Sequence, residues 1–222
     1  MDNKNIGIVL AGGIGSRFGG SQPKQYYQIN GKEMIYYSIK AFEGSKTVDD
    51  FIVVVDRAEY ESGRIADKYK VRTVVGGDTR NRSLKNALDH IKENYPRCEK
   101  IIENNAACPM ITSKVIDSMI TILDDYDYIQ CTYKITDALG SYKTKYVDRD
   151  DYFLIQSPDA YKFDLLYKYF DADSTNGHPA AHLPESAKGY NYFDFQPNIK
   201  VTYPEDLRII EIVMNGIDNS QQ

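Results

Sequence analysis

The sequence Ile6-Gly-Ile-Val-Leu-Ala11 is followed at once by Gly12 and Gly13. A short, continuous apolar run that ends in glycines is typical of a buried parallel strand opening into a loop. The run therefore predicts the first, central strand of a sheet. The glycine-rich loop continues to Gly20, and Pro23-Lys-Gln25 follows shortly after it.

Outward from this strand, β-branched runs alternate with helical patterns. Further strands are predicted at 51–55, 71–75, 100–103, 126–133 and 198–202, and helices at 34–42, 59–68, from 78, at 111–123 and up to 213. This alternation predicts an α/β fold, a Rossmann-like three-layer αβα arrangement with a mostly parallel sheet, as one domain over 1–222. A polar, tyrosine-rich segment at about 136–156 predicts a protruding β-arm, and 171–188 predicts a surface loop.

Composition excludes several classes of function. A formal net charge of −5 argues against a broad basic surface for nucleic acid. The three cysteines lack CxxC spacing, which favours a reducing cytosol over a disulfide framework or a zinc site. No segment resembles a signal peptide or reaches a membrane-spanning length. We therefore expect a cytoplasmic protein without nucleic-acid or membrane partners.

The glycine loop carries the first chemical signal. Glycines directly after a strand let backbone N–H groups approach a phosphate, and Arg17 and Lys24 add positive charge. This combination predicts a triphosphate cradle, against the alternative of an ordinary glycine turn with solvated charges. Phe18 stands where a dinucleotide fingerprint needs glycine, which leaves an NAD-binding domain as a remote alternative, and no Gly-Lys-Ser/Thr is present for a P-loop.

Four motifs follow one another in the chain. They are Leu10-Ala-Gly-Gly-x-Gly-x-Arg17, Pro23-Lys-Gln-Tyr26, Gly76-Gly-Asp-x-Arg-x-x-Ser83 and Asn198-Ile-Lys-Val-Thr202. Together they resemble the family that contains 2-C-methyl-D-erythritol 4-phosphate cytidylyltransferase and ribitol-5-phosphate cytidylyltransferase. The resemblance covers nearly the whole chain and implies a Mg2+-dependent enzyme that uses CTP and a small phosphorylated acceptor, giving a CDP-linked product and pyrophosphate.

The resemblance implies that Arg17, Lys24 and Lys200 hold and neutralise the CTP phosphates. Electrostatics supports the same assignment, because an anionic acceptor must attack a highly anionic triphosphate and cations have to offset the repulsion. A solvent-facing strand residue is the alternative for Lys200. Its place at the carboxyl end of the predicted strand 198–202, where open α/β sheets bind ligands, favours the functional role.

The resemblance also implies a set of nucleotide-binding positions. They are Leu10, Ala11, Gly12, Gly13, Gly15, Gly77, Arg80, Ser83 and Asn105. Backbone groups of 11–13 are expected to read the base and ribose. Arg80 and Ser83 lie three residues apart in the first turn of a helix, so both can face one crevice, although Ser83 could serve as a cap only.

The sequence departs from the family at one segment. The family usually carries His-Asp-Ala-x-Arg-Pro where this chain has Asn104-Asn-Ala-Ala-Cys-Pro109. Asn105, the expected contact to metal, nucleotide and acceptor, is a weaker ligand for Mg2+ than a carboxylate, and Cys108 cannot bind the acceptor phosphate as arginine does. We therefore favour an alditol or glycerol phosphate acceptor, used for a surface polymer. Methylerythritol phosphate and a non-catalytic CTP-binding relative are the alternatives.

The predicted arm carries two further candidates for acceptor binding. Arg149 matches a substrate-phosphate arginine of the family, and Asp137 stands where the arm begins. In the family this arm reaches across a homodimer, so Arg149 is expected to serve the neighbouring subunit; an exposed arm charge is the alternative. His178 and His182 are separated by Pro179, which disfavours a helical metal pair and predicts solvated loop histidines.

Overall fold

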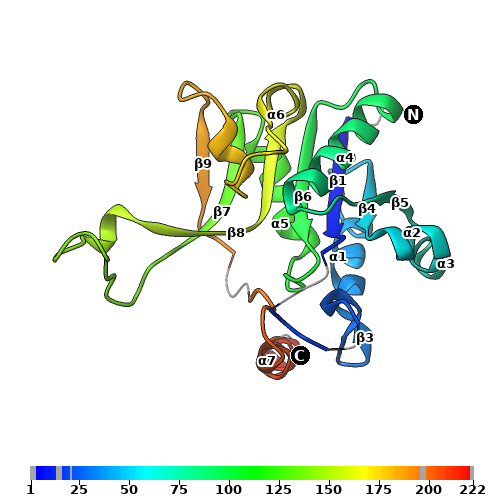
Figure 1. The fold of residues 1–222 in the computed structure, drawn as a ribbon, viewed down its shortest axis with the longest axis horizontal. Helices are drawn as coiled ribbons and strands as arrows, with labels where there is room; N and C mark the ends of the chain where they lie inside the picture. Colours follow the sequence, from blue (N-terminus) through cyan, green and yellow to red (C-terminus); the bar gives the residue numbers. More distant parts are fainter. Residues whose placement is uncertain (1–3, 14–16, 21, 196–198, 221–222) are drawn as a thin grey trace.

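The computed structural model describes residues 4–13, 17–20, 22–195 and 199–220, with the backbone alone for 217–220. A seven-stranded sheet in the order β5-β4-β1-β6-β8-β7-β9 forms its centre (Figure 1). The strands are β1 (Asn5–Ala11), β4 (Asp50–Val55), β5 (Arg72–Val75), β6 (Lys100–Asn105), β7 (Tyr128–Lys134), β8 (Phe153–Lys162) and β9 (Gly189–Tyr192). Within this sheet β8 alone runs against its neighbours. The predicted Rossmann-like, mostly parallel architecture is confirmed.

Helices cover both faces of the sheet (Figure 1). They are α1 (Met34–Glu43), α2 (Arg57–Ser62), α3 (Arg64–Tyr69), α4 (Arg80–Asn94), α5 (Ser113–Ile122), α6 (Phe163–Tyr169) and α7 (Glu205–Ser220). Short 3-10 turns lie at Lys24–Tyr26, Arg149–Asp151 and Pro179–His182, and β2 (Gln28–Ile29) pairs with β3 (Lys32–Glu33) in a small hairpin. Among the helices in the described ranges, none is long and apolar enough to cross a membrane.

The central strand β1 is apolar throughout because both of its faces are covered. Val9 and Ala11 pack in the hydrophobic core beneath α1 and α5. Ile8 and Leu10 point the other way, into the core beneath α4 and α6. Because successive side chains of β1 enter two different buried layers, neither face of the strand is polar.

Two predicted elements differ from the structure. The helix expected at 59–68 is broken into α2 and α3 by Gly63, whose backbone adopts a left-handed conformation with φ of 68°. The strand expected at 198–202 is wrong for its described part, because 199–202 has irregular backbone. The backbone N–H of Val201 instead donates to the carbonyl oxygen of Ala107 at 2.8 Å, which ties this segment to the loop after β6.

The arm is the one part that projects from the body of the described chain (Figure 1). The chain leaves the sheet after Lys134 and returns at Phe153. Residues 153–156 pair with 131–134 of β7, so this end of the predicted arm belongs to the sheet. Asp137 and Arg149 both lie in the exposed part between the two strands.

Gly7 tests how tightly β1 is packed. A Cβ atom at this position would stand 2.5 Å from Cδ1 of Phe42 and 2.9 Å from Cβ of Phe51. We expect Gly7→Ala to lower the free energy of unfolding by about 1–3 kcal/mol, because overpacking forces neighbouring side chains to shift. Urea denaturation measures this.

The matched control is Gly140→Ala on the arm, where a Cβ atom meets nothing within 4 Å. Its effect should stay within about 0.5 kcal/mol. Equal stability of the two variants would contradict the packing described for β1.

Candidate active site

A cavity of about 940 Å³ opens at the carboxyl ends of four parallel strands. Most of the lining residues follow the ends of these strands: Leu10–Gly13 from β1 and its loop, Asp56 and Arg57 after β4, Gly76–Arg80 after β5, and Asn105–Ala107 after β6. The others are Arg17, Phe18, Lys24, Gln25, Ser83, Lys200 and Thr202. The chain crosses from one side of β1 to the other between β5 and β6. Ligands of open α/β sheets bind at such a switch point.

The glycine loop forms the inner wall of this cavity. A Cβ atom at Gly12 would lie 3.5 Å from the Cα atom of Gly76 and from the carbonyl oxygen of Val55, so the loop passes close to the neighbouring strand ends. At Gly13 a Cβ atom would meet nothing within 4 Å. The backbone there is open to a ligand, as a phosphate cradle requires. Gly15, also expected to bind nucleotide, lies outside the described residues.

Arg17, Lys24 and Lys200 line this one cavity. The Nζ atom of Lys24 donates to the carbonyl oxygen of Val201 at 2.7 Å. Burial, followed by the positive charges of Lys200 and Arg17, lowers the pKa of Lys24. The three cations thus act on one another, and together they make a strongly positive site for an anion. Lys200 reaches the cavity from irregular backbone rather than from a strand end.

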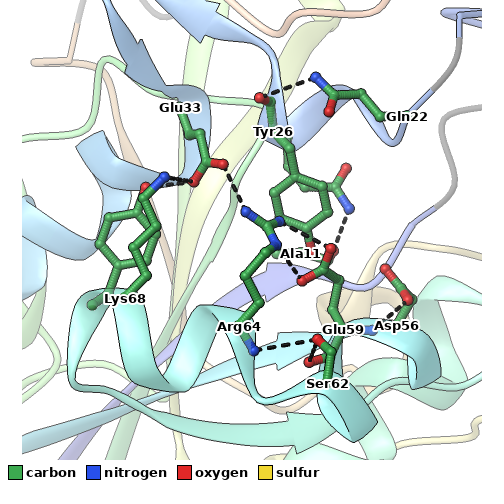
Figure 2. Close-up of polar contacts among 11 residues, drawn as sticks. Ala11, Gln22, Tyr26, Glu33, Asp56, Glu59, Ser62, Arg64 and Lys68 are labelled. Carbon is green, nitrogen blue, oxygen red and sulfur yellow. Dashed lines mark hydrogen bonds and ion pairs between the residues drawn. The ribbon is translucent and has the colours of Figure 1, made fainter.

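The residues that follow Lys24 in the chain are tied to the rest of the protein, and Figure 2 shows the contacts around Tyr26 and Ala11. The buried Gln25 donates from Nε2 to the carbonyl oxygen of Ala11 at 2.5 Å, which ties the turn to the end of β1. The guanidinium of Arg64 stacks over the ring of Tyr26 at 4.5 Å. Lys24 is the one charged residue of the Pro-Lys-Gln motif. The sequence around it does not indicate that Gln25 and Arg64 support its position.

Arg64 is anchored in turn by two carboxylates (Figure 2). It donates to Glu33 at 2.8 Å and to both oxygens of Glu59 at 2.8 and 2.9 Å. The pKa of Glu33 reflects two opposed effects: burial acts to raise it, and hydrogen bonds from Tyr69, Lys68 and Arg64 outweigh burial and lower it. This network connects the β2-β3 hairpin to α2 and α3 behind the cavity wall.

Ser83 shapes the loop after β5. Its Oγ atom accepts from the backbone N–H of Gly77 at 3.1 Å and donates to the carbonyl oxygen of Gly77 at 3.2 Å. A Cβ atom on Gly77 would stand 2.5 Å from Cβ of Arg82, so only glycine fits there. The hydroxyl hydrogen of Ser83 is therefore used within the protein, whereas the helix is capped by Thr79, whose Oγ1 accepts from the backbone N–H of Arg82 at 3.1 Å. Contact of Ser83 with a nucleotide stays a prediction.

Arg80 lies in the cavity wall and is already engaged. Its guanidinium forms an ion pair with the fully buried Glu103, and its Nη1 atom donates to the carbonyl oxygen of Gly177 at 2.9 Å. Burial opposes the charge of Arg80, and the carboxyl groups of Glu103 and Asp159 outweigh that effect and raise its pKa. Contact with a nucleotide stays a prediction for Arg80.

Asn105 and Cys108 differ in their position relative to the cavity. Asn105 lines the cavity, and its Oδ1 atom accepts from the backbone N–H of Ala107 at 3.0 Å. Cys108 is 2% exposed and is not among the lining residues, so the structure does not bring it to the cavity as predicted. Burial raises the pKa of its thiol to about 11, against the opposing effect of Lys200 and Lys24.

Asp137 and Arg149 do not line the cavity of their own chain. The exposed guanidinium of Arg149 donates to the carbonyl oxygen of Thr136 on the arm. Within the described part of the chain, no group of three or more His, Cys, Asp or Glu side chains could hold a metal ion.

The prediction of solvated loop histidines is wrong. The side chain of His178 is only 23% exposed, and its Nε2 atom lies 2.9 Å from Oε1 of Gln130. His182 accepts through Nδ1 from the backbone N–H of Asp171 at 3.2 Å. Burial, together with the charges of Arg80 and His182, lowers the pKa of His178 to about 4. Sequence spacing does not show that this loop folds back onto the sheet.

Comparison with known proteins places these features in a family. The family model described as IspD, 2-C-methyl-D-erythritol 4-phosphate cytidylyltransferase, matches residues 6–216. An enzyme of that name from Clostridium botulinum (strain Eklund 17B / Type B) is 33% identical, over 94% of this chain and 98% of its own length. The bifunctional ribulose 5-phosphate reductase/CDP-ribitol pyrophosphorylase Bcs1 of Haemophilus influenzae is 31% identical over 94% of this chain, which spans 48% of that longer protein.

Solved structures agree on the fold. The 4-diphosphocytidyl-2C-methyl-D-erythritol synthase of Anaerococcus prevotii superposes with a TM-score of 0.80 at 18% identity, covering 97% of this chain and all of the other. The family model and the relatives above 30% identity span nearly the whole chain, and the resemblance seen in the motifs is thereby confirmed. The chain is a nucleotidyltransferase of the cytidylyltransferase class and belongs to the 2-C-methyl-D-erythritol 4-phosphate cytidylyltransferase family.

Proposed function

We propose that this protein transfers CMP from CTP to a small phosphorylated polyol of the alditol or glycerol phosphate type, releasing pyrophosphate, for the synthesis of a surface polysaccharide. The observation that carries the proposal is the meeting of Arg17, Lys24 and Lys200 in one cavity at the glycine loop. The named relatives support both the nucleotide and the class of acceptor. A cytoplasmic location stays a prediction from the cysteine content.

The reaction follows from this charge arrangement. An oxygen of the acceptor phosphate attacks the α-phosphorus of CTP, a new P–O bond forms, and the bond to the β-phosphate oxygen breaks with release of pyrophosphate. Lys24, fixed by Val201 and Gln25, offsets the negative charge that accumulates along the phosphate chain, and Arg17 and Lys200 do so from other sides. Backbone N–H groups at Gly12 and Gly13 complete the cradle.

The donor set suits a Mg2+ ion held mainly by the nucleotide. Asn105 offers at most one further lone pair, because its amide oxygen already accepts from Ala107. Mg2+ commonly keeps water and substrate phosphate oxygens as ligands. When bound, the ion neutralises phosphate charge, and the cations of the chain position the same group.

The choice of acceptor rests on the segment 104–109. With Cys108 buried away from the cavity, this segment provides no cation for the acceptor phosphate. This supports an acceptor other than methylerythritol phosphate. The methylerythritol phosphate reaction is the second candidate, favoured by the name of the Clostridium botulinum relative. A non-catalytic CTP-binding protein is the third.

The missing acceptor cation can come from a second subunit. The arm carries Arg149, and its surface exposes Tyr142 and Tyr146 at 111% and 78%. The first residues of β8, Phe153–Ile155, are 38–43% exposed. Adjoining exposed apolar side chains on a projecting element favour a protein contact. We infer a homodimer in which Arg149 contacts the acceptor in the neighbouring cavity.

The reaction is tested by pyrophosphate release from CTP and Mg2+ with ribitol 5-phosphate, glycerol 3-phosphate or methylerythritol phosphate. We expect turnover with an alditol or glycerol phosphate, and a loss of about 10²–10³ in kcat/KM for Lys24→Gln, as for other groups that stabilise developing charge. Lys46→Gln, an exposed lysine outside the cavity, is the control. No turnover with any acceptor, or full activity of Lys24→Gln, would overturn the proposal.

The lowered pKa of Lys24 predicts a pH dependence. Its charge is present at low pH and is lost, as the pH rises, earlier than for an ordinary lysine. The kcat/KM for CTP reports the free enzyme, so it should fall on the alkaline side. Lys200→Met removes a repulsive charge and should move that fall to higher pH, whatever its effect on the maximum rate; Lys46→Gln should leave it in place. If kcat/KM falls at the same pH in Lys200→Met as in the wild type, the effect of Lys200 on the pKa of Lys24 is contradicted.

Sharing of the site between subunits predicts complementation. Lys24→Gln and Arg149→Ala should each be nearly inactive alone. Mixed after dissociation, they should regain about a quarter of wild-type activity, because half of the dimers are mixed and each of these has one complete site. No recovery, with mixed dimers demonstrated by mass, would place Arg149 outside the neighbouring site.

A further inference from the structure

A row of polar side chains crosses the sheet beneath α4. Glu103 on β6 lies opposite Asp159 on β8, and Asp159 lies opposite Gln130 on β7. Glu103 is 0% exposed and Asp159 3%. Directly opposed residues of antiparallel strands have Cβ atoms about 4.5–5.5 Å apart. Two carboxyl groups are thus buried side by side, and we call Glu103 and Asp159 the acidic pair.

The acidic pair has too little positive charge around it for two ionised groups. Arg80, from α4, forms an ion pair with Glu103. Oε2 of Glu103 and Oδ1 of Asp159 accept no hydrogen bond from any residue that the structure describes. Adjacent buried carboxylates cannot both ionise without such partners, because each disfavours the charge of the other. Burial, and then the charge of Glu103, raise the pKa of Asp159 well above its usual value, although Arg80 and a hydrogen bond from the backbone of Cys131 oppose them.

The remaining groups around Asp159 fit a protonated carboxyl. Nε2 of His178, from the loop over the sheet, faces the amide oxygen of Gln130 at 2.9 Å and therefore carries the hydrogen. A neutral imidazole then turns a bare Nδ1 toward Oδ2 of Asp159, 3.8 Å away. Tyr161, two residues along β8 from Asp159, is fully buried, and its pKa is raised by burial and by both carboxyl groups. The cluster is neutral overall when Arg80 and one carboxylate are charged.

Arg80 connects this cluster to the cavity. Arg80 contributes to the cavity wall, and its guanidinium donates to the carbonyl oxygen of Gly177 in the loop 173–178. The next residue, Asn81, donates to the carbonyl oxygens of Ser174 and Asn176 at 3.0 and 2.9 Å. The first turn of α4 and this loop are therefore held together around the Arg80–Glu103 ion pair.

We propose that Glu103 and Asp159 share one proton and carry a single negative charge, and that this charge positions Arg80 in the nucleotide wall of the cavity. The charge can reside on either carboxyl. With neither ionised, the partly buried Arg80 has no counter-ion; with both ionised, the guanidinium is drawn toward the sheet and away from the ligand. Glu103 and Asp159 are positioning residues that act through Arg80. The part that concerns CTP rests on the proposed function.

Glu103→Gln, Asp159→Asn and the double variant test the shared charge. In each single variant the remaining carboxyl ionises, so Tm should change little and the KM for CTP should stay within about threefold. In the double variant Arg80 loses both partners. We expect Tm to fall by much more than the sum of the single changes, and the KM for CTP to rise about tenfold or more with a smaller change in kcat.

A triple variant separates positioning from stability. Adding Arg80→Gln to the double variant removes the unpaired, partly buried charge, so Tm should recover while the KM for CTP stays high. Arg82→Gln is the matched control, because Arg82 lies in the same turn and forms an exposed ion pair with Asp173 in the same loop at 2.6 Å. Its KM for CTP should equal that of the wild type.

Additive Tm changes in the double variant would overturn the shared charge. Recovery of the KM for CTP in the triple variant would overturn the positioning role. The Tm measurements are made without nucleotide, so they test the acidic pair even if the wild-type protein fails to use CTP. That failure would refute the proposed function alone.

Discussion

Repulsion between like charges governs the design of this site. Arg17 and Lys24 lie seven residues apart after β1, Lys200 comes from much later in the sequence, and all three line one cavity, where Lys200 and Arg17 disfavour the charge of Lys24. A protein holds such a cluster only if its scaffold restrains it. Here backbone groups provide the restraint. The carbonyl oxygen of Val201 accepts from Lys24, and the N–H of Val201 donates to the loop after β6. A bound triphosphate would supply the negative charge that offsets these three cations.

The opposite problem, an excess of acidic groups, arises in the sheet beneath α4. Glu103 and Asp159 bring two acidic groups into a buried place with one arginine, and neutrality requires a retained proton. Arg80 belongs to both regions, because it pairs with Glu103 and lines the cavity. The positive cavity and the buried acidic pair therefore share one side chain, which links the geometry of the nucleotide wall to the charge state of the sheet interior.

Local patterns predicted the parts of this molecule that local physics determines. The apolar run of β1, the glycines after it and the cation of Pro-Lys-Gln are short-range signals, and the structure has them where they were expected. The register in which β8 pairs with β6 is not determined by local sequence. Nothing near Glu103 in the sequence indicates that an antiparallel strand places Asp159 opposite it, or that the loop with His178 covers both.

The remaining errors have the same origin. Burial of Cys108 depends on how the loop after β6 packs, and the irregular backbone at 199–202 depends on its tie to Ala107. The roles of individual site residues come from family resemblance, whereas their supports, such as Gln25 and Arg64, emerge only from tertiary contacts.

A structure of the protein with CTP tests the central claim most directly. The account predicts a triphosphate lying along Gly12 and Gly13, with phosphate oxygens in contact with Arg17, with Lys24 and with Lys200. A nucleotide bound elsewhere, or one whose phosphates leave these three cations in solvent, would contradict it.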